Sequence, residues 1–302
     1  MDTVPVTFCR DVASLMSEDV ADCERLPNPW GSALKSIEER KSFSIHISEV
    51  TPNCFFYSLS IAIAPPTLKD MLSWNSRLIQ CSEIEIGPFE RDNQARRAIS
   101  KERLIYQLTP FLRRCIAPES SLKITVRTAN ETVSAMLGQL KEVKFASIEL
   151  NYCGLDAEDL LEKQMINMKL GRLVMTGQWP HPSRTSEMLS KIIANGHLQF
   201  VELQCYPYTD VPCNLKIDFS IFKALFDAWV ESKGERKFLV EGLAEVTTKE
   251  MNVYARDFDS DFTTNSISYR SPSGEFASNF NVEESQFRRG AVSLTSGKKR
   301  WQ

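Results

Sequence analysis

The sequence predicts an α/β fold with a small N-terminal helical module, an irregular α/β repeat domain and a C-terminal β-hairpin. Two observations support this prediction. A short apolar motif recurs through the middle of the chain, and a stretch with helical periodicity follows several of its copies. The composition agrees, since 42% hydrophobic and 25% charged residues over 302 positions are typical of a globular protein with a sizeable core.

The helical module is predicted over residues 1–42. Pro5 can open a helix, because its missing N–H is not needed in the first turn. The apolar residues Phe8, Val12 and Leu15 then recur at the spacing of one helical face. From Phe43 onward the apolar residues alternate instead, which indicates a change to strands.

The repeat domain is predicted over residues 43–243, from the motif in FASIELNYCGL at residues 145–155. Its apolar positions match L-x-x-L-x-L-x-x-N/C-x-L, the segment that opens a leucine-rich repeat. The central copies begin at residues 121, 145, 170 and 198, so the steps are 24, 25 and 28 residues. Leucine-rich repeats span about 20–29 residues, so this spacing favours a leucine-rich-repeat-like solenoid.

The segments between these copies have the periodicity of amphipathic helices, over 129–140, 156–168 and 183–195. A solenoid is not the only fold that fits, because only one copy carries the Cys or Asn that ladders between turns. The apolar positions would also suit the strands of an ordinary α/β sheet, which is the alternative interpretation.

Towards the C-terminus, residues 217–235 predict a helix with an aromatic face, interpreted as a cap on the solenoid. A hairpin region is predicted over 244–285, because a Ser-Pro-Ser-Gly turn at 271–274 separates two strand-like segments. The last segment, 286–302, is rich in Ser, Gly, Lys and Arg and predicts a disordered tail.

No pattern typical of a catalytic, metal or cofactor site occurs in the sequence. The eight cysteines form no Cys-x-x-Cys motif, no glycine-rich phosphate loop is present, and the three histidines lack the partners of known catalytic motifs. We therefore predict a protein that is not an enzyme and needs no cofactor or metal. An enzyme with an unrecognised site is the alternative.

Charge and hydropathy restrict the partners and the compartment. A formal charge of −3 predicts no nucleic-acid binding, and the longest apolar stretch, residues 54–66, is too short to span a membrane. The cysteines lie mostly among apolar residues, which predicts buried free thiols in a reducing compartment, cytoplasmic and/or nuclear. We expect a monomer outside any complex.

The remaining candidate for function is the face of the predicted sheet that points away from the helices. Its side chains mix polar groups with aromatic anchors, which favours a protein partner. The alternative is a solvated sheet face that binds nothing. The candidate partner-binding residues are Lys123, Arg127, Glu149, Asn151, Tyr152, Arg172, Phe200 and Glu202.

The N-terminal block contains Met-Asp-Thr-Val-Pro-Val-Thr-Phe-Cys at 1–9, Trp-Gly-Ser-Ala at 30–33 and Arg-Lys-Ser-Phe at 40–43. In these three stretches it resembles the start of a nematode family of F-box-like proteins with divergent repeats. The resemblance implies an F-box-like module that docks on a Skp-type adaptor of a cullin ubiquitin ligase, while the repeats hold a substrate. The adaptor-binding candidates that it implies are Val4, Pro5, Phe8, Val12, Leu15 and Trp30.

The sequence departs from this family between residues 17 and 29, where two prolines replace the usual leucine-rich helix. A module of this kind could cap the repeat domain without binding an adaptor. The alternative function is therefore a stand-alone repeat scaffold with no link to a ligase.

Overall fold

The computed structural model describes the chain in segments: Cys9 and residues 41–51, 53–60, 66–74, 79–89, 95–195, 197–203, 213–232, 235–254, 266–270, 277–284 and 291–299. These residues belong to two compact units, unit 1 over 1–123 and unit 2 over 124–302. The predicted helical module lies almost wholly outside the described residues. Of residues 1–40 only Cys9 is described, and it is helical and buried.

Unit 1 is built on a mixed sheet with the strand order β5-β3-β1-β2-β4. Strand β1 pairs in parallel with β3 and antiparallel with β2, and β2 pairs antiparallel with β4. Alternating apolar residues, such as Phe43, Ile45 and Ile47 of β1, are buried in the core. The strands are β1 (Lys41–Thr51), β2 (Cys54–Leu59), β3 (Ile79–Ile86), β4 (Arg97–Ile99) and β5 (Ile116–Ile124).

Beyond Cys9, the helical elements described in unit 1 are α3 (Leu68–Ser73), α4 (Lys101–Arg103), the π-helical turn η2 (Leu104–Leu108) and α5 (Thr109–Cys115). Thr67 and Asp70 form a capping box at the start of α3. The π turn precedes Pro110, which has no N–H to continue an α-helical ladder. The carbonyl of Leu104 accepts from the backbone N–H of Thr109 and also from the Thr109 hydroxyl, at 2.9 Å.

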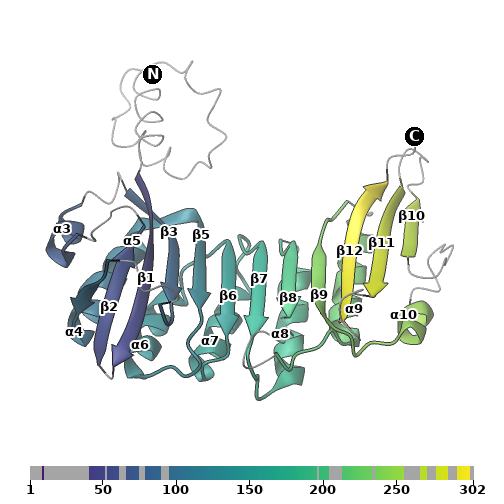
Figure 1. The fold of residues 1–302 in the computed structure, drawn as a ribbon. Coiled ribbons are helices and arrows are strands. Elements are labelled where there is room, and N and C mark those ends of the chain that lie inside the picture. Colours follow the sequence, from purple (N-terminus) through teal and green to yellow (C-terminus); the bar gives the residue numbers. More distant parts are fainter. Residues whose placement is uncertain are drawn as a thin grey trace. The chain divides into compact units, whose positions relative to one another are not determined.

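Unit 2 contains a run of four parallel strands, β6 (Ser147–Asn151), β7 (Arg172–Thr176), β8 (Phe200–Leu203) and β9 (Leu239–Leu243). Three antiparallel strands continue this sheet beyond β9 in the order β12 (Ala291–Lys299), β11 (Ala277–Glu284) and β10 (Ser266–Arg270). Figure 1 shows the two groups in teal to green and in yellow.

The helices of unit 2 are α6 (Glu131–Leu140), α7 (Leu155–Gln164), α8 (Pro182–Ala194), α9 (Phe219–Glu231) and α10 (Thr248–Tyr254). Helices α6 to α9 follow one another along the same side of the parallel strands (Figure 1). Asn130 caps α6 by accepting from two backbone N–H groups, and Asp218 caps α9 by accepting from one. Aromatic residues of α9, including Phe222, Phe226 and Trp229, are buried, so this face belongs to the core.

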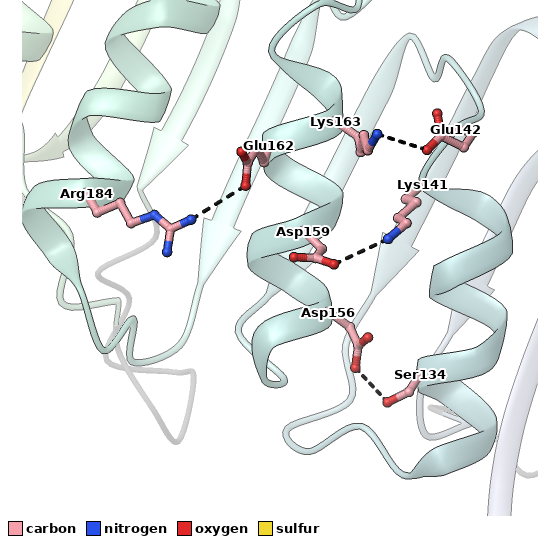
Figure 2. A network of polar contacts seen from close by, with 8 residues as sticks. All are labelled: Ser134, Lys141, Glu142, Asp156, Asp159, Glu162, Lys163 and Arg184. Atoms are coloured by element: carbon pink, nitrogen blue, oxygen red, sulfur yellow. Dashed lines mark hydrogen bonds and ion pairs between the residues drawn. The ribbon is translucent and has the colours of Figure 1, made fainter.

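Polar contacts tie the outer surfaces of α6, α7 and α8 together (Figure 2). Lys141 of the α6 C-cap lies 3.3 Å from Asp159, and the hydroxyl of Ser134 donates to Asp156 at 2.6 Å. Arg184 extends the network to α8 through Glu162 at 3.5 Å. Exposed ion pairs contribute only about 0–1 kcal/mol each, so apolar burial beneath the helices supplies most of the stability.

The predicted fold class is wrong. The chain is not a helical module followed by a solenoid: the described residues form an α/β fold whose central strands are parallel and whose outer strands are antiparallel. The recurring motif does mark strands β6, β7 and β8, and the helices between them were predicted. A motif of three apolar positions requires only a strand that is buried on one face, and an ordinary α/β sheet, the alternative interpretation, meets this requirement equally well.

The C-terminal strands differ from the expected tail. Strands β10 and β11 form an antiparallel pair around residues 271–276, where the hairpin is predicted. Strand β12 lies within 286–302, the segment for which the sequence predicts disorder, and it pairs with both β11 and β9. Long-range pairing with β9 can order a polar segment whose own composition is too weak to predict a strand.

The described cysteines are free thiols, and all except Cys54 are buried. Burial raises the pKa of Cys81 to about 12 and the pKa values of Cys115 and Cys153 to about 11. These groups stay protonated and unreactive at neutral pH. An unfolded thiol ionises near pH 8.5, so their contribution to stability is complete below that pH and is lost as the pH rises towards 11–12.

Within the described segments, every helix is too short or too polar to cross a bilayer.

Candidate functional site

The parallel strands of unit 2 present one face to the helices and the opposite face away from them. In β6 the residues Ile148 and Leu150 are buried, whereas Ser147, Glu149 and Asn151 between them are partly exposed. This period of two places their side chains on opposite faces of the sheet. We call the side of β6 to β9 away from α6 to α9 the open face, because no described helix covers it (Figure 1).

The strand register arranges the open face in two rows that cross the four strands. The first row is Ser147, Arg172, Phe200 and Leu239, and the second is Glu149, Val174, Glu202 and Glu241. Neighbours in a row lie on adjacent strands, about 4.8 Å apart. The open face therefore combines an apolar and cationic row with an acidic row.

The first row contains a cation–π contact between two predicted site residues. The guanidinium carbon of Arg172 lies 5.0 Å from the centre of the Phe200 ring. Arg172 is exposed and Phe200 is partly exposed. Stacking on the ring holds the guanidinium over the surface and leaves its outer N–H groups able to donate.

The second row contains two glutamates on adjacent strands. Glu202 pairs in register with Glu241 of the neighbouring strand. Glu202 is only 9% exposed, although it carries an ionisable group. Like charges directly opposite each other in a sheet are destabilising, so this pair is an electrostatically unfavourable feature of the bare surface.

Asn151, a predicted site residue, makes two side-chain hydrogen bonds within unit 2 at the end of β6. Its side-chain N–H₂ donates to the carbonyl of Val126 at 2.7 Å, and its side-chain oxygen accepts from the hydroxyl of Thr176 at 3.0 Å. Both polar atoms of the amide are thus engaged in joining successive segments. Gly177, which follows Thr176 in the chain, has φ 83°, and a Cβ at Gly177 would lie 2.5 Å from the side-chain oxygen of Asn151.

Tyr152 follows Asn151 and packs against Trp179, with 5.2 Å between the ring centres. The indole N–H of Trp179 donates to the carbonyl of Thr176 at 3.1 Å. Burial raises the pKa of Tyr152, and the negative charge of Glu158 raises it further. The phenol is therefore a neutral donor at physiological pH, and its ring is held by a buried tryptophan.

Lys123 and Arg127 do not belong to the open face of β6 to β9. Lys123 lies on β5 in unit 1, where it forms an ion pair with Glu85 at 2.9 Å. His46 approaches the same carboxylate at 3.5 Å through Nδ1, and its Nε2 lies 3.1 Å from the carbonyl of Gly87. Both ring nitrogens of His46 therefore contact acceptors. This arrangement suits a structural role better than that of a catalytic base. Arg127 is exposed in a bend after β5.

The structure adds one residue that sequence reasoning missed, Glu241 on β9. From the sequence we assign no candidate site residue in this part of the predicted repeat domain. The alternation of Leu239 and Glu241 with buried Val240 would have indicated the outward face. The six adaptor-binding candidates, Val4, Pro5, Phe8, Val12, Leu15 and Trp30, lie outside the described residues.

Within the described residues, no three histidine, cysteine or acidic side chains gather in an arrangement that could hold a metal ion. A surface concavity is lined by Pro180, His181, Pro182, Ser183 and Arg184. These five residues are consecutive, so the concavity does not bring together polar groups from separate elements, as an active site usually does.

Fold and surface together define an α/β protein with a polar and aromatic open sheet face. Comparison with protein-family models, with curated proteins and with solved structures gives no match. The functional argument therefore depends on the residues themselves, and the F-box-like resemblance stays a prediction.

Proposed function

We propose that the protein acts without catalysis and recognises another protein through the open face of β6 to β9. The observation that carries this proposal is the contact between Arg172 and Phe200 on that face. Arginine and aromatic side chains contribute much of the energy of protein interfaces. A guanidinium already stacked on a ring loses little conformational freedom when a partner docks.

The strands also favour recognition because they hold these side chains on a rigid support. Leu239 of β9 lies in the first row and provides partly exposed apolar surface beside the charged groups, whereas Val174 of β7 in the second row is fully buried. Interfaces combine such apolar centres with polar rims. A nucleic acid fits less well, since Glu149, Glu202 and Glu241 would face its phosphates.

The proposal predicts that loss of the Phe200 ring weakens partner binding. Short peptides selected from a random displayed library against the full chain should bind the Phe200→Ala variant at least about tenfold more weakly, or about 1.4 kcal/mol. Fluorescence anisotropy with the selected peptides measures the effect. Tyr106→Ala is the matched control, because it removes an exposed aromatic ring from unit 1.

Circular dichroism of both variants must show the folded spectrum. Failure to select any peptide, or equal binding by Phe200→Ala and the wild-type chain, would contradict the proposed function. Binding that depends equally on Tyr106 would show non-specific attachment to exposed aromatic rings instead.

The role as a substrate-binding ligase adaptor is a narrower proposal and is supported only by the resemblance of the N-terminal block. It predicts that the full chain binds a Skp-type adaptor, and that Phe8→Ala and Leu15→Ala each weaken this binding by more than about 1 kcal/mol without unfolding the chain. Isothermal titration calorimetry provides the measurement. No binding by the folded wild-type chain would leave the stand-alone scaffold as the surviving function.

A cytoplasmic and/or nuclear location is part of the same proposal. It is supported by the free state of the described cysteines, because thiols persist in compartments that glutathione and thioredoxin keep reducing.

A further inference from the structure

We propose that the loop between α7 and β7, residues 165–171, binds the surface of an anionic lipid bilayer. Ile166 and Met168 enter the layer of lipid head groups, and Lys144 and Lys169 contact the negative charges of the lipids. This inference goes beyond the proposed function, because it concerns the edge of unit 2 at which β6, β7 and β8 begin and does not involve the open face.

The loop exposes two large apolar side chains. Ile166 is 74% exposed and Met168 is 53% exposed. Exposed apolar residues that are scattered singly are normal on a protein surface, but here two lie only two positions apart in one short loop. Such high exposure also means that both side chains project from the surface and do not line a groove.

Asn167 fixes the loop between these two side chains, and only 6% of it is exposed. Its side-chain N–H₂ donates to the carbonyl of Phe145 at 2.8 Å and to the side-chain oxygen of Gln164 at 2.6 Å. Its own side-chain oxygen accepts from the backbone N–H of Lys169 at 3.0 Å. The buried amide therefore anchors the loop while the apolar residues on either side stay outside. A loop that is already held in shape loses little conformational entropy on binding.

A basic residue precedes each of β6, β7 and β8 by three positions: Lys144, Lys169 and His197. All three are exposed. The first residues of the three strands are paired in register, and backbone hydrogen bonds join the loops that lead into them. The basic side chains therefore belong to neighbouring loops along one edge of the sheet, with the loop of Ile166 and Met168 in the middle.

The positive charge of this edge is not balanced by the chain. The loops 141–146, 165–171 and 195–199 contain one acidic residue, Glu142, and it already pairs with Lys163 at 3.2 Å (Figure 2). Within the described residues, neither Lys144 nor Lys169 forms an ion pair or a side-chain hydrogen bond. A lysine close to an anionic membrane surface strengthens binding roughly fivefold.

The combination of lysine and aliphatic side chains favours a bilayer over other partners. The phosphates of a nucleic acid would attract the lysines but offer no apolar medium to Ile166 and Met168. Protein interfaces are enriched in aromatic residues and arginine and depleted in lysine, whereas these three loops expose no aromatic or arginine side chain among their described residues. At a bilayer surface, aliphatic side chains reach the acyl boundary while lysines extend to the head groups.

The basic residues also have a possible structural role, because α6, α7 and α8 end shortly before them. Cations near the C-terminal end of a helix stabilise its dipole. That role would change the melting temperature and leave vesicle binding unaffected, and it gives no reason for the exposure of Ile166 and Met168. Thermal unfolding followed by circular dichroism therefore accompanies each binding measurement.

The test measures co-sedimentation of the full chain with lipid vesicles. One set contains equal parts of phosphatidylcholine and phosphatidylserine, and the other contains phosphatidylcholine alone. We expect the wild-type chain to bind the mixed vesicles at least about tenfold more strongly than the neutral ones. The variants Ile166→Ser and Lys169→Gln should each weaken binding to the mixed vesicles about fivefold or more.

Each variant has a matched control in unit 2. Leu155→Ser removes an apolar side chain that is 72% exposed at the other end of α7. Lys249→Gln removes an exposed lysine from α10, which follows the carboxyl end of β9 and so belongs to the opposite edge. Both controls should change vesicle binding less than about twofold.

Absence of binding by the folded wild-type chain to the mixed vesicles would overturn the proposal, as would equal loss in Ile166→Ser and Leu155→Ser. Equal binding to mixed and neutral vesicles would also contradict it. If Lys169→Gln weakens binding to a single-stranded oligonucleotide while Ile166→Ser affects neither ligand, the edge binds polyanions and the bilayer proposal fails. The proposed function is tested separately, because the library peptides measure the open face and the vesicles measure this edge.

Discussion

Replacement of Gly177 by alanine is expected to lower the free energy of unfolding of unit 2 by about 3 kcal/mol. Gly177 has φ 83°, a conformation that costs an L-residue about 1–2 kcal/mol. The new Cβ would also lie 2.5 Å from the side-chain oxygen of Asn151. That amide must then move, which weakens its hydrogen bonds to Val126 and Thr176. Urea denaturation followed by tryptophan fluorescence measures the loss.

Gly138 provides the control for this substitution. It lies inside helix α6, and a Cβ there would meet nothing within 4 Å. Alanine has the higher helix propensity, so Gly138→Ala should raise the free energy of unfolding by up to about 1 kcal/mol. A Gly177→Ala variant as stable as the wild-type chain would mean that the junction after β7 does not require a left-handed residue.

Replacement of Trp179 by alanine is expected to destabilise unit 2 by about 3–5 kcal/mol. Trp179 is fully buried, its indole N–H donates to Thr176, and its backbone N–H donates to the side-chain oxygen of Asn214. Alanine would leave a cavity beside Tyr152 and remove one of the two donors to the Thr176 carbonyl, which also accepts from the backbone N–H of Tyr152 at 3.0 Å. Urea denaturation followed by circular dichroism is the suitable measurement, since the change removes a fluorophore.

Two further variants separate the free-energy cost of the cavity from that of the lost hydrogen bond. Trp179→Phe removes the indole donor but retains much of the ring volume, so it should cost less than Trp179→Ala. Trp74→Ala removes a partly exposed indole that makes an edge contact with Phe43 in unit 1, and it should cost less still. A Trp179→Ala variant destabilised by under about 1 kcal/mol would contradict the central packing role of this residue.

The contacts of Gly177 and Trp179 also show why the sequence and the structure give different interpretations of Asn151 and Tyr152. Their place after a strand and their polar chemistry suggested contacts with a partner. The structure commits the Asn151 amide to Val126 and Thr176, each 25 residues away in the chain. Hydrogen bonds over that separation depend on how strands align, and local sequence does not report it.

The residues of the candidate site were predictable where a local rule applied. Period-two alternation was enough to assign Glu149, Arg172 and Glu202 to the outward face. It could not show that Glu202 would have Glu241 as its neighbour, because β8 and β9 are separated by helix α9 and long connections. The adjacency of Glu202 and Glu241 is therefore a property of strand pairing.

The sequence by itself determined where the strands and helices of the central part of the chain lie. Apolar periodicity is local, since each of β6, β7 and β8 buries one face and each intervening helix buries one stripe. Only the tertiary structure decided how those strands are ordered, that antiparallel strands adjoin β9 and pair with β1, and that the result is an α/β sheet rather than a solenoid. The physical reason is that strand pairing is made by backbone hydrogen bonds between distant segments, and every residue except proline carries the N–H donor for them, whatever its side chain.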